Sequence, residues 1–332
     1  MDRIKVAVIG VGYLGRQHVR VYSELENVEL VGVVDKNPAI AQAVADQYKT
    51  RAFTDFRELY GKVLAVSLAV PTSDHSRIGC ELLFNGADVL VEKPIAASVT
   101  QAEELIQAAA QRQRILQVGH LERFNPAVAE ARKMLTNPLF FEVHRLGIFT
   151  SRSLDIDVVF DLMIHDLDIV LSFVQSKVKA VRAVGLPILS TKVDIANARI
   201  EFENGCVANL TASRVSTEKV RKLRFFQPSE YISVDYSRQD VVVVSVGSAN
   251  GGSTPIILPR KIELPKVEPL KAEIRSFLQT VQTRDWPVVT GEESKKALEL
   301  AQQVVEGIRK HASAVDLPAV ALPTPSQGFE TG

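Results

Sequence analysis

Residues 4–18 read IKVAVIGVGYLGRQH, an apolar run followed at once by three glycines in the spacing GxGxxG. The run is typical of a buried strand, and the following segment is typical of a helix. Gly10 permits the tight turn, Gly12 lets the backbone approach a pyrophosphate, and Gly15 lets the helix pack closely on the strand. The stretch therefore predicts a dinucleotide-binding turn. We expect these residues to contact the cofactor: Gly10, Gly12, Tyr13, Leu14 and Gly15.

A second apolar strand is expected at Val28 to Val34, and it ends at Asp35. A carboxylate there accepts hydrogen bonds from an adenosine ribose and repels a 2′-phosphate, which favours NAD over NADP. The neighbouring Lys36 is a cation that tolerates a phosphate, so NADP is the alternative cofactor. The other interpretation of the glycine turn is an α/β turn that binds no nucleotide.

The remaining sequence predicts two domains of different architecture, as expected for 332 residues at roughly 150 residues per domain. Short apolar runs alternate with helix-period segments up to about His120, which predicts an α/β Rossmann domain at 1–120 with a doubly wound parallel sheet. Several strand-like runs then follow one another without helices, which predicts an α+β domain at 121–313 with a large, mostly antiparallel open sheet. The proline-rich end, 314–332, is expected to be a flexible tail.

Composition excludes several classes of function. The chain has 39 basic and 39 acidic residues, so it lacks the positive charge that general nucleic-acid or membrane-surface binding requires. Its two cysteines, Cys80 and Cys206, cannot form a disulfide framework or a four-cysteine zinc site. With no apolar stretch long enough for a signal peptide or a membrane span, a cytoplasmic protein is expected.

Two further strand ends carry polar residues where ligands bind in doubly wound sheets. One reads Pro71-Thr72 and the other reads Glu92-Lys93-Pro94. The backbone of Lys93 is restrained by the sheet before it and by the proline ring after it, which favours a role in binding or chemistry. The alternative is a surface lysine whose stem covers the edge of the sheet.

A helix expected at about Val158 to Val174 is apolar apart from four polar residues at helical spacing: Asp161, His165, Asp168 and Ser172. Buried polar groups need partners, so this stripe must face other polar groups, water or a ligand. Asp161 is spaced to hydrogen-bond His165 and raise its basicity, which would make His165 a general base. A structural hydrogen-bond network and a metal site are the alternatives.

Taken together, these motifs resemble the Gfo/Idh/MocA oxidoreductase family, which includes glucose-fructose oxidoreductase and inositol dehydrogenase. The resemblance extends to about His311 and includes the stretch GHLERFNP at 119–126. It implies hydride transfer between a nicotinamide and a sugar or polyol, without a metal, in a homo-oligomer (dimer or tetramer) assembled through the C-terminal sheet. It also implies that Lys93 hydrogen-bonds the reacting oxygen, that His165 is the acid/base and that Asp161 is its partner. Further cofactor contacts are expected at Pro71, Thr72, His75, Glu92, Lys93 and Arg123.

Within the family, the strings VGHLERFNP, FDLMIHDLDI and LTASRVS are similar to enzymes that oxidise the 3-hydroxyl of UDP-N-acetylglucosamine, a step before transamination to a 3-amino sugar for lipid A. The resemblance places Lys93, Asp161, His165 and Arg214 at the substrate, and the basic segment from Arg214 to Arg224 suits a diphosphate. Met163 replaces a glycine that is frequent in the family, which predicts a different pocket floor. The alternatives are a dehydrogenase of a free sugar or inositol, a metal-dependent enzyme, and a non-catalytic dinucleotide sensor.

Overall fold

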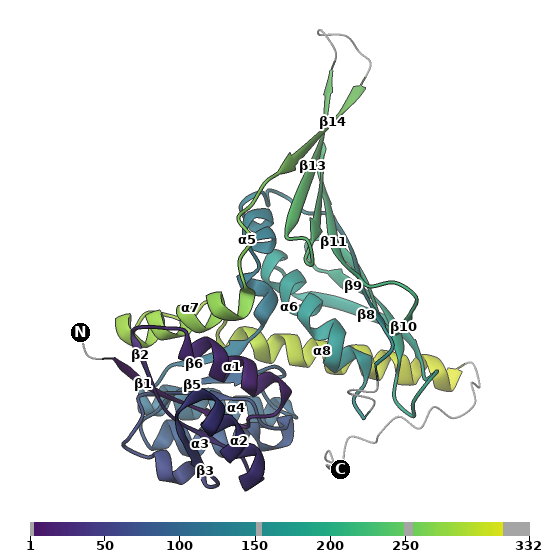
Figure 1. The fold of residues 1–332 in the computed structure, drawn as a ribbon. Helices are drawn as coiled ribbons and strands as arrows, with labels where there is room; N and C mark the ends of the chain where they lie inside the picture. The colour runs from purple at the N-terminus through teal and green to yellow at the C-terminus, as the bar shows by residue number, and fades with distance from the viewer. Residues whose placement is uncertain (1–2, 151–154, 249–254, 315–332) are drawn as a thin grey trace. The chain divides into compact units, whose positions relative to one another are not determined.

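The computed structural model of the protein describes residues 3–150, 155–248 and 255–314, and it divides into two compact units (Figure 1). The first unit contains the chain up to Leu121 together with Glu268–Lys295. The second contains the described residues of Glu122–Val267 and residues 296–314. None of the helices in the described residues is long and apolar enough to span a membrane.

The first unit is built on a six-stranded parallel sheet in the order β3-β2-β1-β4-β5-β6. Its strands are β1 (Ile4–Ile9), β2 (Val28–Val34), β3 (Arg51–Phe53), β4 (Ala65–Leu68), β5 (Asp88–Glu92) and β6 (Leu116–Gly119). Strand order reverses between β1 and β4, which is where ligands bind in such sheets. The predicted Rossmann architecture is confirmed. The short edge strand β3 was not expected, because three residues carry too little pattern to be recognised.

Helices cover the sheet of the first unit. They are α1 (Tyr13–Ser23), α2 (Pro38–Tyr48), α3 (His75–Phe84), α4 (Val99–Arg112) and α7 (Pro269–Thr283), with short 3-10 turns η1 (Phe56–Leu59) and η2 (Thr72–Asp74). The side chain of Ser98 caps α4 by accepting a hydrogen bond from the Gln101 amide at 3.2 Å. Helix α7 joins this unit, and not the later domain as expected, because Ile274 and Phe277 are buried in its core.

The second unit is built on an eight-stranded sheet in the order β14-β13-β12-β11-β7-β10-β9-β8. Its strands are β7 (Phe140–Ile148), β8 (Val178–Leu186), β9 (Ile195–Phe202), β10 (Val207–Ser216), β11 (Val220–Gln227), β12 (Glu230–Asp235), β13 (Asp240–Ser248) and β14 (Pro255–Ile262). Neighbouring strands run antiparallel except β7 and β10, which are parallel. The predicted α+β architecture with a large, mostly antiparallel sheet is confirmed. Strands β13 and β14 extend as a ribbon beyond the other strands (Figure 1).

Helices pack on this sheet and close its core. They are the 3-10 turn η3 (Leu121–Phe124), α5 (Pro126–Lys133), the π-helical turn η4 (Val159–Met163), α6 (Ile164–Phe173) and the later part of α8 (Gly291–Ala314). Phe141, Phe173 and Phe225 meet in the core, with ring centroids 5.5 to 6.3 Å apart. Apart from Ala314, at the end of α8, the expected tail 314–332 lies outside the described residues.

Candidate active site

The three positions after β1 are occupied by glycine for different physical reasons. Gly10 has φ +81°, and a Cβ there would lie 2.6 Å from the Ala69 carbonyl oxygen. A Cβ on Gly15 would lie 1.8 Å from the Gly10 oxygen. Gly12 is the N-cap of α1, and a Cβ there would meet nothing within 4 Å. The space beside Gly12, at the N-terminus of α1, is therefore open, and a helix N-terminus is a place where proteins bind phosphates.

Asp35 follows β2 and is held beside the glycine turn by two backbone amides. Its Oδ2 accepts a hydrogen bond from the Val11 amide at 3.1 Å, and its Oδ1 accepts one from the Asn37 amide at 3.0 Å. These bonds hold the carboxylate at the end of its strand, which is the position expected for a residue that binds a ribose. The residues present therefore fit a dinucleotide: an open helix end for its phosphates and a fixed carboxylate for its ribose.

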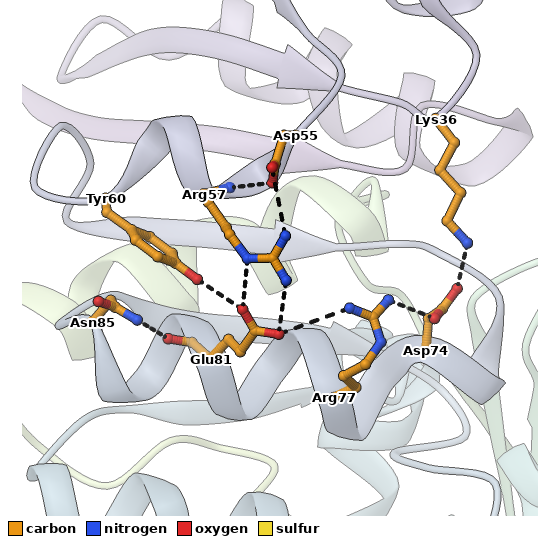
Figure 2. A network of polar contacts seen from close by, with 8 residues as sticks. All are labelled: Lys36, Asp55, Arg57, Tyr60, Asp74, Arg77, Glu81 and Asn85. Atoms are coloured by element: carbon orange, nitrogen blue, oxygen red, sulfur yellow. Dashed lines mark hydrogen bonds and ion pairs between the residues drawn. The ribbon is translucent and has the colours of Figure 1, made fainter.

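Lys36 is exposed, and its ammonium group forms an ion pair with a carboxylate. Its Nζ donates to Asp74 Oδ2 at 3.0 Å, and Asp74 also accepts from Arg77 at 2.8 Å. Figure 2 shows that Arg77 reaches on to Glu81, which accepts hydrogen bonds from Arg57 and Tyr60. The Arg77 hydrogen bond lowers the pKa of Asp74 below its ordinary value. The charge of Lys36 is thus opposed by a carboxylate from the first turn after β4.

The turn after β4 is tied to the turn after β5 by His75. Pro71 is exposed and Thr72 half-buried, whereas His75 is fully buried. Its Nδ1 lies 2.9 Å from the Pro94 carbonyl oxygen and its Nε2 lies 3.0 Å from the Val70 carbonyl oxygen. Burial lowers the pKa of His75, and the two carbonyl oxygens oppose that shift because they can accept hydrogen bonds from its ring. The placement gives His75 a positioning role for the two strand ends.

Glu92 and Lys93 lie at the end of β5. Glu92 is buried: its Oε1 lies 2.9 Å from His18 Nε2, and its Oε2 accepts a hydrogen bond from the Lys93 amide at 3.2 Å. His18 Nδ1 in turn contacts the Ser67 hydroxyl at 3.0 Å. A Cβ on Gly119 would lie 3.0 Å from Glu92 Oε2, so that glycine leaves room for the carboxylate. Lys93, half-buried, is therefore presented by a backbone held from both sides.

In the second unit, Asp161 lies in the π-helical turn η4 and His165 in the first turn of α6, and both are half-buried. The four polar residues expected on one helix face do not all contact the same partner. Asp168 is buried in an ion pair with Arg123, and Ser172 donates to the Ile169 carbonyl of its own helix. The π-helical turn also changes the angular spacing that an uninterrupted α-helix would give these residues.

Arg123 was expected at the cofactor, and the structure places it in a buried fork. Its Nε and Nη2 donate to the two oxygens of Asp168 at 2.7 and 3.1 Å. Nearby, Arg145 forms the same kind of fork with Asp166 at 2.7 and 2.9 Å. Bidentate buried pairs of this kind hold elements in register. A direct contact between Arg123 and the cofactor stays a prediction.

The basic segment of β10 and β11 is partly used for structure. Arg214 is buried, its Nε 3.6 Å from Asp194 Oδ1, and it donates to the Ile156 carbonyl. Arg224 forms an ion pair with Glu142 at 3.0 Å. Arg221 is half-buried, and burial followed by the charge of Arg145 lowers its pKa. Asp161 is near enough to oppose that shift, so Arg221 and Asp161 share one electrostatic environment.

Two further placements could not be anticipated from local sequence. Met163 is 1% exposed and packs in the core of the second unit. The different pocket floor expected from it stays a prediction. The hydrogen bonds that join Glu92 to His18 and His18 to Ser67 were not predicted from the sequence. His18 comes three residues after the glycine motif, which is a signal, but its contact with Glu92 is 74 residues away in sequence.

Comparison with known proteins gives two family matches. Residues 4–120 match the model described as an oxidoreductase family with an NAD-binding Rossmann fold, and residues 133–227 match the GFO/IDH/MocA C-terminal domain. A UDP-N-acetylglucosamine 3-dehydrogenase from Acidithiobacillus ferrooxidans is 36% identical over 92% of this chain and 97% of its own. Its crystal structure superposes with a TM-score of 0.87, covering 93% of this chain and 99% of that one.

A more distant relative has a different substrate. A scyllo-inositol 2-dehydrogenase (NAD⁺) from Bacillus subtilis is 24% identical over 92% of this chain and 94% of its own. Family members that align over almost the whole chain therefore include both a nucleotide-sugar enzyme and a cyclitol enzyme.

Proposed function

Because the chain belongs to the Gfo/Idh/MocA oxidoreductase family, we propose that it is an NAD-dependent dehydrogenase that oxidises the 3-hydroxyl of UDP-N-acetylglucosamine to the 3-keto sugar. The observation that carries the substrate is the 36% identity to a UDP-N-acetylglucosamine 3-dehydrogenase across nearly the full length of both chains. A transaminase could convert the 3-keto product to a 3-amino sugar, which is the step toward lipid A expected from the sequence.

The cofactor is assigned to the glycine turn and Asp35. The open space at Gly12 and the fixed Asp35 carboxylate support this assignment. When bound there, the nicotinamide of NAD accepts the hydride from the sugar carbon. The protein contributes binding and orientation, and the Asp74 carboxylate beside Lys36 supports NAD over NADP because it opposes the cation that a 2′-phosphate would need.

Three residues are assigned to the chemistry. His165 accepts the proton of the reacting hydroxyl, and Asp161 orients its ring. Lys93 donates a hydrogen bond to the same oxygen and stabilises the negative charge that develops on it. The support for Lys93 is its place at a strand end whose backbone Glu92 holds; the support for the other two is their half-buried position around the start of α6.

The diphosphate of the substrate is assigned to the basic segment of β10 and β11. Arg221 is half-buried and Lys219 is exposed, so these two cations are less enclosed than Arg214, whereas Lys222 points to the opposite face of β11 from Arg221. Arg214 instead has Asp194 and a carbonyl around its guanidinium. Its role at the substrate would be to keep β10 in place.

The experiment that tests this proposal follows NADH formation with UDP-N-acetylglucosamine, UDP-glucose, N-acetylglucosamine and scyllo-inositol as substrates. We expect turnover with the first, and Lys93→Ala or His165→Ala should lower kcat at least about a hundredfold while NAD still binds. Lys5→Ala and His311→Ala, at exposed positions, serve as matched controls. Turnover of inositol without turnover of the nucleotide sugar, or near-normal activity in both variants, would refute the assignment.

A homo-oligomer through the C-terminal sheet stays a prediction. Exposed apolar side chains occur on its strands and their ends, including Ile148, Val246 and Ile257. Such residues are frequent at interfaces between subunits. Light scattering on the purified protein should give a mass of two or four chains of 36.5 kDa each, and a monomer at micromolar concentration would contradict it.

A further inference from the structure

Three ionisable side chains meet behind the strand end that carries Lys93. They are His18 from α1, Glu92 from β5 and Glu273 from α7, here called the buried triad. One ligand-type atom from each lies within 4.8 Å of the others. His18 and Glu273 are 0% exposed and Glu92 is 7% exposed. Burial of three such groups is costly unless their charges and hydrogen bonds are satisfied.

The hydrogen bonds of the triad are unevenly distributed. Both ring nitrogens of His18 are engaged, one by the Ser67 hydroxyl and one by Glu92. Glu92 also accepts from the Lys93 amide. Among the described residues no donor meets either carboxyl oxygen of Glu273. Gln117 donates to the Glu273 backbone carbonyl at 3.4 Å, and its own Oε1 also lacks a donor.

Hydrogen-bond acceptors therefore outnumber donors around Glu273, and a proton on this carboxyl group would supply the missing donor. Electrostatics points the same way. Burial raises the pKa of Glu92, but His18 and Lys93 outweigh that effect and hold it below its ordinary value. Burial raises the pKa of Glu273 well above its ordinary value, and the charge of Glu92 raises it further. Two neighbouring carboxyl groups then carry one negative charge between them.

A metal ion is the other occupant that such a triad could hold, and the geometry disfavours it. Two ligands at about 2.0–2.1 Å from a tetrahedral zinc lie about 3.3 Å apart. His18 Nε2 and Glu92 Oε1 are 2.9 Å apart, the distance of a hydrogen bond. Since both nitrogens of His18 already have hydrogen-bond partners, a metal would have to displace one of them.

We propose that Glu273 is a neutral carboxylic acid in the working protein, and that the triad places a single buried negative charge, on Glu92, behind the backbone of Lys93. His18 is then a positioning residue, and Glu273 is a neutral neighbour of the pair that His18 forms with Glu92. His18 orients the carboxylate that accepts a hydrogen bond from the Lys93 amide. With Glu273 neutral, Glu92 is the one charged carboxylate of the triad beside His18. The groups that face Glu273 are Glu92 on β5, His18 and Tyr22 on α1, and Gln117 on β6.

The proton on Glu273 is tested by infrared spectroscopy, independently of activity. We expect the carbonyl stretch of a protonated carboxylic acid at pH 7, shifted when the protein is made with [¹³C]glutamate and lost in Glu273→Gln. Labelling separates this band from buried aspartates such as Asp88 and Asp166. Glu29→Gln, at an exposed position, should keep the band. No glutamate-derived band at pH 7 in the wild-type protein would overturn the proposal, even if the variant failed to fold.

The link to Lys93 rests on the function proposed above and needs a separate readout. Glu273→Gln should keep kcat within about twofold and leave the pH profile of kcat unchanged, because the amide is neutral like the acid. His18→Ala should lower kcat about tenfold or more with little change in the Kd for NAD. A bound divalent metal, one per chain in the wild-type protein and absent in Glu273→Gln, would overturn the proposal. A band present with no turnover of any sugar would refute only the proposed function.

Discussion

The neutral state of Glu273 makes a specific prediction for stability against pH. Glu273→Gln replaces a buried carboxylic acid by a neutral amide of the same shape. In the wild-type protein the folded pKa of Glu273 lies well above its ordinary value, so the folded state keeps a proton that the unfolded state has released above about pH 4.3. Stability is therefore lost as pH rises from that value toward the folded pKa, and the variant has no such loss.

The magnitude follows from proton linkage. One proton retained only by the folded state costs about 1.4 kcal/mol for each pH unit. Between pH 5.5 and pH 7.5, Glu273→Gln should gain stability on the wild-type protein, by at most about 3 kcal/mol for one proton over two pH units. For a unit of about 150 residues the difference in Tm should therefore widen with pH, by at most roughly 11 °C. The fixed effect of the substitution on packing cancels, because only the change with pH is compared.

The assay is thermal unfolding followed by circular dichroism at pH 5.5, 6.5 and 7.5. Glu29→Gln, which removes an exposed carboxyl group, is the control and should follow the wild-type curve. A Tm difference that stays constant across this range would show that Glu273 is ionised in the folded protein throughout. That result, or a difference that narrows as pH rises, would refute the reasoning.

Three other variants separate cofactor binding from folding. Gly12→Ala adds a methyl group where nothing lies within 4 Å, so it should weaken NAD binding at least about tenfold by calorimetry and leave Tm almost unchanged. Arg284→Ala removes two hydrogen bonds, of 2.9 and 2.8 Å, from the fully buried carboxylate of Asp88, and chemical unfolding should show a loss of about 2–3 kcal/mol, less than for a fully buried pair because the arginine is half-exposed. Asp74→Asn frees Lys36 and should raise kcat/KM with NADP by up to about fivefold, the scale of a surface ion pair, with no such rise with NAD.

Local sequence was sufficient for the first fold and its cofactor turn. The features that predict them are a strand, three glycines at fixed spacing, a helix and a second strand ending at Asp35. Each is determined by residues close together in the sequence, so the sequence pattern is enough to predict it. The change from alternating strands and helices to consecutive strands likewise predicted the second architecture. The family resemblance came from the same short motifs, and the matches over 4–120 and 133–227 confirm it.

Tertiary structure decided what each polar side chain contacts. Arg123 pairs with Asp168 across 45 residues, and His18 meets Glu92 across 74, so no local spacing could have indicated either contact. Helix α7 carries Glu273 into the core of the first unit although the chain has by then left that domain. The physical reason is common to all three. A buried polar group faces whichever groups the packing of distant elements brings within reach, and those neighbours are a property of the fold and not of the adjacent sequence.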